Sequence, residues 1–206
     1  MKQQMIYLAS QSPRRRELLA QIGVDFTVCS VNVIEQHQSG ESASDYVTRL
    51  ACDKAQAGVI ALNNGAFSDA GSIKLKAGSI VLGADTIVVY AGQVLEKPTD
   101  EADAIRMLNL LSGNEHRVMT AVALADRERC LVEVVTTQVT FRHILPDEMR
   151  DYWYSGEPVD KAGSYAIQGL GGKFVANING SYSAVVGLPL MQTEQLIKAF
   201  MAAQNK

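Results

Sequence analysis

The chain has 206 residues, of which 47% are hydrophobic and 20% are charged, and its formal net charge is −3 at pH 7. This length suits one domain with a sizeable core, or one domain divided into two lobes. The negative charge argues against a general affinity for nucleic acid or for an anionic membrane surface. No apolar run approaches the roughly 20 residues of a membrane span. The cysteines lack metal-ligand spacing and the first residues lack a secretory pattern, so we expect a cytoplasmic protein with reduced thiols.

Strand-like and helix-like segments alternate along the chain, which favours the α/β class. An apolar, β-prone run at 5–9 precedes a helical pattern that begins at Pro13, with Ser12 in the N-cap position. Ser42 and Thr99 are the expected N-caps of two later helices. Further strands are expected at 25–33, 80–90, 93–95, 118–125 and 131–142, short strands within 163–187, and helices at 43–62, 100–111, 146–154 and 191–203.

The segment from 63 to 79 differs from the rest of the chain because it is rich in glycine, asparagine and serine. This composition predicts an exposed insertion loop. Neither an internal repeat nor a linker rich in proline and serine marks a domain boundary, so we expect residues 1–206 to form a single domain.

The segment 10–16 reads Ser-Gln-Ser-Pro-Arg-Arg-Arg and directly follows the first strand. A helix that starts here offers free N–H groups, the positive end of its dipole, hydroxyls and guanidinium groups, all of which favour an anion such as phosphate. Ligands in α/β sheets collect at the carboxyl ends of strands, which supports this interpretation. The alternative is a capped surface helix with solvated arginines.

Asp85 interrupts the most apolar strand of the chain, the segment 80–90. A carboxylate in such a strand is unfavourable to bury unless it is paired, hydrogen-bonded or bound to a metal. Its small neighbours Gly83 and Ala84 would let a ligand approach the backbone closely. Asp85 is therefore either a metal ligand or general base, or a structural carboxylate paired with an arginine.

Lys54 lies in the apolar stripe of the helix predicted at 43–62. It either extends past its neighbours into solvent or reaches into a cleft at the edge of the stripe. Glu35, after the second strand, is the best second carboxylate, and Lys97 lies where the hairpin turns toward a helix. Gln168 is a candidate for recognising the edge of a base, because its amide can both donate and accept hydrogen bonds. Together these residues fit an enzyme that binds a polyphosphate and a divalent metal.

Several motifs, taken in order, resemble the Maf family of nucleotide pyrophosphatases over nearly the whole chain. They are Ser10-Gln11-Ser12-Pro13-Arg14-Arg15, Glu35, Lys54, Gly83-Ala84-Asp85-Thr86, Glu96-Lys97-Pro98, Asp160-Lys161-Ala162-Gly163 and Ile167-Gln168-Gly169. The resemblance implies an α/β fold in which helices flank an elongated mixed sheet, with a central active-site cleft between two lobes. It also implies cytoplasmic, metal-dependent hydrolysis of nucleoside triphosphates to the monophosphate and pyrophosphate.

The resemblance also implies roles for individual residues. Asp85 is the expected catalytic proton acceptor, and with Glu35 it is expected to hold a divalent cation (Mg²⁺, Mn²⁺ or Co²⁺). The residues expected to bind substrate are Ser10, Arg14, Arg15, Lys54, Thr86, Lys97 and Gln168. Among these, Arg14, Thr86 and Gln168 resemble the branch that acts on dTTP and UTP and are expected to select the base.

Other functions remain as alternatives at this point. A nucleotide-sensing regulator of cell division and septum formation, with incidental catalysis, is the main one, since family members are associated with septum inhibition. A nucleic-acid-binding module is disfavoured by the net charge. The resemblance implies nucleoside triphosphates as partners, including modified pyrimidine nucleotides as targets of housecleaning, and a second copy of the chain in a homodimer. The preferred nucleotide and metal are not evident from the residues.

Overall fold

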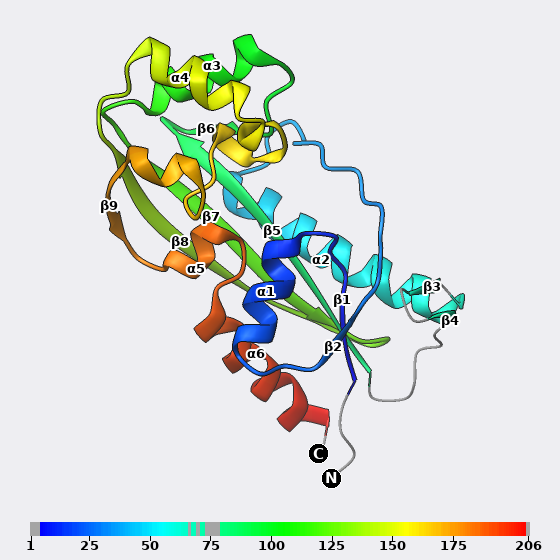
Figure 1. Ribbon diagram of the computed structural model, residues 1–206. Helices are drawn as coiled ribbons and strands as arrows, with labels where there is room; N and C mark the ends of the chain where they lie inside the picture. The colour runs from blue at the N-terminus through cyan, green and yellow to red at the C-terminus, as the bar shows by residue number, and fades with distance from the viewer. Residues whose placement is uncertain (1–4, 66, 69–70, 73–78, 205–206) are drawn as a thin grey trace. The chain divides into compact units, whose positions relative to one another are not determined.

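The computed structural model describes residues 5–65, 67–68, 71–72 and 79–204 (Figure 1). The helices are α1 (Pro13–Gln21), α2 (Ala43–Asn63), α3 (Glu101–Leu111), α4 (Pro146–Tyr154), α5 (Tyr182–Val186) and α6 (Leu190–Gln204). The strands are β1 (Ile6–Leu8), β2 (Phe26–Val28), β3 (Phe67–Ser68), β4 (Gly71–Ser72), β5 (Ile80–Tyr90), β6 (Gln93–Leu95), β7 (Glu115–Ala125), β8 (Cys130–Phe141) and β9 (Val175–Asn179).

One sheet contains seven of the strands in the described part of the chain, in the order β2-β1-β5-β7-β8-β9 with β6 paired to β5. Its pairs are parallel around β1 and antiparallel at β5–β6 and β8–β9. The prediction of a mixed α/β fold is therefore confirmed. The chain divides into two compact units: unit 1 comprises Met1–Asp85, Thr120–Val134 and Gly187–Lys206, and unit 2 comprises Thr86–Met119 and Val135–Val186.

Unit 1 is built around the short strand β1, which is parallel to β2 on one side and to β5 on the other. Leu8 lies opposite both Val28 and Leu82. The crossover from β1 to β2 and the crossover from β2 to β5 run across the sheet in opposite directions. Because crossovers between parallel strands are right-handed, their helices lie on opposite faces of the sheet. Accordingly, α1 lies in front of these strands and α2 behind them in Figure 1. The strand order thus reverses at β1.

Two glycines allow α2 to pack closely on the parallel strands. A Cβ atom at Gly83 of β5 would collide with the backbone oxygen of Ala51 and lie 2.6 Å from the backbone nitrogen of Ala55. A Cβ atom at Gly58 of α2 would lie 2.6 Å from a methyl group of Val81. The backbone of α2 therefore touches β5 directly at Gly83, with no side chain between them.

The helix starts were predicted with mixed success. Ser42 caps α2 as expected, because its hydroxyl accepts from the N–H of Asp45 at 3.1 Å. The prediction of Thr99 as a cap is wrong: the carboxylate of Asp100 holds the N-cap position and accepts from the N–H of Asp103 at 2.8 Å. Ser12 does precede α1, but its side chain makes no capping hydrogen bond.

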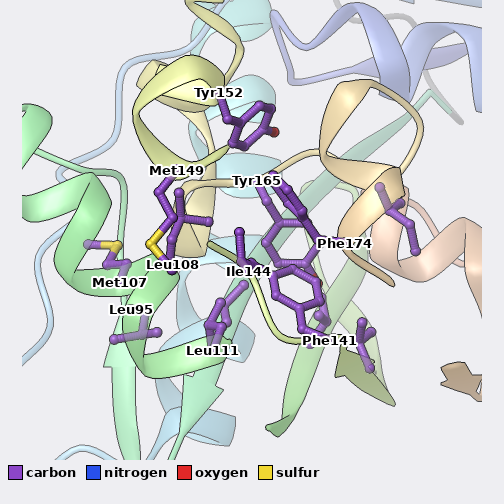
Figure 2. Close-up of a cluster of buried hydrophobic side chains, with 14 residues drawn as sticks. Leu95, Met107, Leu108, Leu111, Phe141, Ile144, Met149, Tyr152, Tyr165 and Phe174 are labelled. Atoms are coloured by element: carbon purple, nitrogen blue, oxygen red, sulfur yellow. The ribbon is translucent and has the colours of Figure 1, made fainter. Parts of the chain in front are cut away.

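Unit 2 contains an apolar cluster that joins α3, α4, β6 and the ends of the long strands (Figure 2). Aromatic rings in edge-to-face contact form its centre: Phe141 packs on Tyr165 with centroids 4.7 Å apart, and Tyr152 packs on Phe174 at 5.1 Å. Such pairs add about 0.5–1.5 kcal/mol beyond their buried area. The segment predicted to hold short strands at 163–187 contains one strand, β9, while most of the rest forms 3₁₀ turns and α5.

The expected insertion loop at 63–79 stays a prediction. Helix α2 extends to its first residue, Asn63, and within it β3 pairs antiparallel with β4. Residues 66, 69–70 and 73–78 lie outside the described residues. Where helices are described, none combines the length and the apolar character needed to span a bilayer.

We predict that Gly83→Ala destabilises the protein by about 1–3 kcal/mol or more, because overpacking against a helix backbone cannot be relieved by a rotamer change. Gly58→Ala is the comparison and should be less destabilising, since its new methyl group meets a side chain instead of backbone and alanine favours a helix interior. Chemical denaturation measures both variants. Equal stability of the two would contradict the close packing at Gly83.

Candidate active site

Asp85 lies at the point in unit 1 where the strand order reverses. Strand β1 ends at Leu8, paired with Leu82, whereas β5 continues, so Asp85 lies beyond the end of its shorter parallel neighbour. Ser10 and α1 follow the same end of β1. In open α/β sheets, ligands bind outside the carboxyl ends of the strands at such a reversal. The topology therefore places Asp85 and Ser10 where a ligand site is expected.

The ammonium group of Lys54 joins two carboxylates. Its Nζ lies 2.6 Å from Oδ1 of Asp85 and 2.5 Å from Oε1 of Glu35. The side chains of Lys54 and Asp85 are only 11% and 9% exposed, whereas that of Glu35 is 35% exposed. Lys54 thus does not extend into solvent from the stripe of α2, and the alternative in which it reaches into a polar site is the one observed.

A second cation approaches the same carboxylates from α1. Arg15 donates from Nη1 to the hydroxyl of Ser10 at 3.4 Å and from Nε to the carbonyl oxygen of Gly187 at 3.0 Å. The Ser10 hydroxyl also accepts from the N–H of Ser12 at 3.2 Å. These bonds fix the guanidinium group at the start of α1, where the helix dipole also favours an anion.

Burial opposes the charges of these groups, and the neighbouring charges offset part of the effect. Burial raises the pKa of Asp85 above its ordinary value, while Lys54 and Arg15 act in the opposite direction. Burial likewise lowers the pKa of Arg15, while Asp85 and Glu35 favour its charged form. A carboxylate with a raised pKa beside fixed cations is a common arrangement for a general base.

Five of the residues expected to form the site meet within unit 1. Arg14 precedes Arg15 in the first turn of α1 and is half-buried. The other expected residues belong to unit 2: Thr86 is half-buried in β5, whereas Lys97 and Gln168 are exposed. The five that meet are Ser10, Arg15, Glu35, Lys54 and Asp85.

The donor set fits a divalent cation in part. Carboxylate oxygens are the ligands that Mg²⁺ and Mn²⁺ prefer, and Mg²⁺ is commonly bound through one or two carboxylates together with phosphate oxygens of a substrate. Asp85 and Glu35 offer two carboxylates to the same position, which the ammonium of Lys54 contacts. Among the described residues, no group of three or more His, Cys, Asp and Glu side chains is arranged to hold a metal. The set is therefore suited to a metal that also binds phosphate.

One partner in the site has no signal in the sequence. The carbonyl oxygen of Gly187 orients Arg15, and a backbone oxygen supplied from far along the chain leaves no mark on the residue pattern. The pairing of the Lys54 ammonium with two carboxylates was also not expected, because both carboxylates were assigned to a metal. Both features depend on tertiary contacts between distant segments.

The family model described as Maf-like protein matches residues 5–200. The chain is 53% identical to the dTTP/UTP pyrophosphatase of Shigella dysenteriae over 201 residues, covering 98% of this chain and 95% of that protein. Proteins of the same name from Yersinia pestis and Aliivibrio fischeri are 55% identical over 97% of this chain and 95% of theirs, and 54% identical over 95% and 98%. The Staphylococcus aureus Ham1 structure shares 16% identity over 67% of this chain and 72% of its own, with a TM-score of 0.41, which is too distant to support an inference.

We predict that Lys54→Met raises the pKa of Asp85, because an opposite charge in contact with the carboxylate is removed while burial remains. Glu35→Gln should shift the same pKa downward, since the Glu35 carboxylate acts on Asp85 with the opposite sign. The carbon-13 resonance of the Asp85 carboxyl group, followed against pH, measures both shifts. Shifts of the same sign in the two variants would contradict the geometry described.

Proposed function

Because the chain belongs to the Maf-like protein family, as its motifs predicted, we propose that it hydrolyses dTTP and UTP to the nucleoside monophosphate and pyrophosphate. The observation that carries the proposal is the buried carboxylate of Asp85, held 2.6 Å from the ammonium of Lys54 at the reversal of strand order. The relatives that are more than half identical to this chain are named dTTP/UTP pyrophosphatases, which supports the choice of substrate.

Asp85 acts as the proton acceptor. In hydrolysis of the α–β bond, a water attacks the α-phosphorus, its proton is accepted by the carboxylate, and pyrophosphate leaves. Burial makes Asp85 a stronger base than an exposed aspartate, because desolvation disfavours its charged form. The contact with Lys54 keeps the carboxylate fixed so that it can orient the water.

The cations stabilise the phosphates. Charge develops on the leaving pyrophosphate as the α–β bond breaks, and fixed positive groups act most strongly where burial excludes water. Arg15 is held by the Ser10 hydroxyl and the Gly187 carbonyl, so little reorganisation is needed when a phosphate binds. Lys54 contributes its ammonium group in the same way, and we assign Lys97 to the same task.

A divalent cation completes the proposal, and Asp85 and Glu35 are the residues that would hold it. Such a cation would supply additional positive charge for the triphosphate. Lys54 already contacts both carboxylates, so it also keeps them together when no cation is bound. Mg²⁺, Mn²⁺ and Co²⁺ are the ions to be compared.

Base selection is assigned to Arg14, Thr86 and Gln168. Guanidinium, hydroxyl and amide groups can together satisfy the carbonyl and N–H groups that thymine and uracil share. A site that hydrogen-bonds such groups rejects an analogue that lacks them far more strongly than an apolar pocket rejects a change in size. This assignment accounts for a preference for dTTP and UTP over other nucleotides.

We predict that Asp85→Asn lowers turnover of dTTP by about 10²-fold or more, since a general base contributes about 10²–10⁴-fold. Nucleotide affinity should change by less than about tenfold, because the cations that contact phosphate remain. Pyrophosphate release and calorimetric binding measure the two quantities. Asp45→Asn, in the exposed first turn of α2, is the control and should retain turnover. Near-normal turnover by Asp85→Asn would show that its proposed role is wrong.

We predict that a panel of canonical and modified nucleoside triphosphates, assayed with Mg²⁺, Mn²⁺ and Co²⁺ in turn, gives the fastest pyrophosphate release with dTTP and UTP. Removal of the cation by a chelator should abolish release, and adding it back should restore it. Turnover below about 0.01 per second for every nucleotide would lie far below the usual enzyme range and would favour a nucleotide sensor instead.

A further inference from the structure

The carboxylate of Glu157 forms hydrogen bonds to the loop that contains Gln168 in unit 2, a role that the sequence did not predict. Gln168 is exposed, whereas Ala166 and Ile167 before it are buried. A 3₁₀ turn, Leu170–Phe174, follows it. An exposed amide can discriminate between bases only if the backbone that carries it is held in one position. The bonds to this backbone therefore matter for selection.

Glu157 holds the chain on the far side of Gln168. Its Oε2 accepts from the N–H of Leu170 at 2.9 Å, and its Oε1 accepts from the N–H of Gly171 at 3.0 Å. Both backbone donors are at the start of the 3₁₀ turn, where a carboxylate satisfies N–H groups that have no partner within the turn. The carboxylate is packed so closely on the loop that a Cβ atom at Gly169 would collide with it.

Tyr152 holds the chain on the near side. Its hydroxyl donates to Oε1 of Glu157 at 2.7 Å and accepts from the N–H of Ala166 at 3.0 Å. Tyr152 is 1% exposed, and its ring packs edge-to-face on Phe174, at one end of the apolar cluster (Figure 2). The hydroxyl is therefore fixed by the core, and through it the carboxylate of Glu157 is fixed as well.

We infer that Glu157 and Tyr152 are positioning residues that hold the backbone on both sides of Gln168 and thereby set the discrimination between pyrimidine bases. This inference rests on the role proposed above for Gln168. Neither residue is needed for the reaction at phosphorus. Their loss loosens the loop, so the amide of Gln168 is held less well for hydrogen bonds to the base that it selects.

The decisive variant is Glu157→Gln, which keeps the shape of the side chain but turns an N–H donor toward Leu170 or Gly171. We expect the ratio of kcat/KM for dTTP to that for dCTP to fall about tenfold, the effect of losing a charged hydrogen bond. The change should appear mainly as a raised KM for dTTP, with kcat within about twofold. Tyr152→Phe, which removes only the hydroxyl, should change the ratio in the same direction.

Asp126→Asn is the matched control. Like Glu157, Asp126 accepts from two successive backbone N–H groups, those of Glu128 at 2.9 Å and Arg129 at 3.0 Å, and it also pairs with Arg129. It lies in the turn between β7 and β8 in unit 1, so its loss should lower stability without changing the ratio. Hydrogen exchange adds a local readout: the amides of Leu170 and Gly171 should exchange faster in Glu157→Gln and unchanged in Asp126→Asn.

Binding of non-hydrolysable α,β-methylene analogues of dTTP and dCTP separates this inference from the proposed function. If the protein prefers the dTTP analogue but releases no pyrophosphate, the proposed activity fails, and a reduced preference in Glu157→Gln supports the positioning role. If Glu157→Gln keeps the wild-type preference or the wild-type exchange rates, the positioning role is overturned. It is also overturned if Gln168→Ala leaves the preference unchanged, or if the wild-type protein has none.

Discussion

The contact of the Lys54 ammonium with the carboxylates of Asp85 and Glu35 is the interaction on which the site in unit 1 depends. An isolated carboxylate in so apolar a strand would be strongly destabilising, and two carboxylates near one another would repel. The ammonium makes both tolerable. Burial keeps the pKa of Asp85 raised, while the ammonium offsets part of that rise and holds the carboxylate in place. The stability of the fold and the proposed reactivity of Asp85 therefore depend on the same contacts between the Lys54 ammonium and the two carboxylates.

In the site and in the Gln168 loop, hydrogen bonds within the protein hold a polar group in place. In unit 1, a serine hydroxyl and a backbone carbonyl fix Arg15 before any phosphate arrives. In unit 2, a tyrosine hydroxyl and a carboxylate fix backbone N–H groups around Gln168. In each case the polar group that we propose as a ligand contact is held by other polar groups of the chain. Such preorganisation lowers the reorganisation needed on binding.

The residue pattern predicted the α/β class, most of the longer strands and helices, and the family, because periodicity and short motifs are local properties. It also singled out Asp85 and Lys54, since a charge within an apolar run is visible without a structure. It could not show that Lys54 joins Asp85 to Glu35, because that contact needs three distant segments to meet. The residue pattern placed the cap of α3 at Thr99, one residue before Asp100, because both residue types cap helices well and single-residue boundaries depend on backbone geometry. Glu157 was missed because its partners are mostly backbone N–H groups.

The contact between α2 and β5 at Gly83 fixes the position of Lys54 relative to Asp85. Side chains of a strand repeat every two residues and those of a helix about every 3.6, so Asp85 shares a face with Gly83, and Lys54 follows Ala51 by nearly one turn. These two spacings bring Lys54 of α2 to Asp85 of β5, where their side chains pair at 2.6 Å. A single residue inserted between Ala51 and Lys54 would turn the lysine by about 100° around the helix axis, away from the carboxylate. Length changes in this stretch of α2 are therefore incompatible with the site, whereas equal changes beyond its C-terminal end leave the alignment intact.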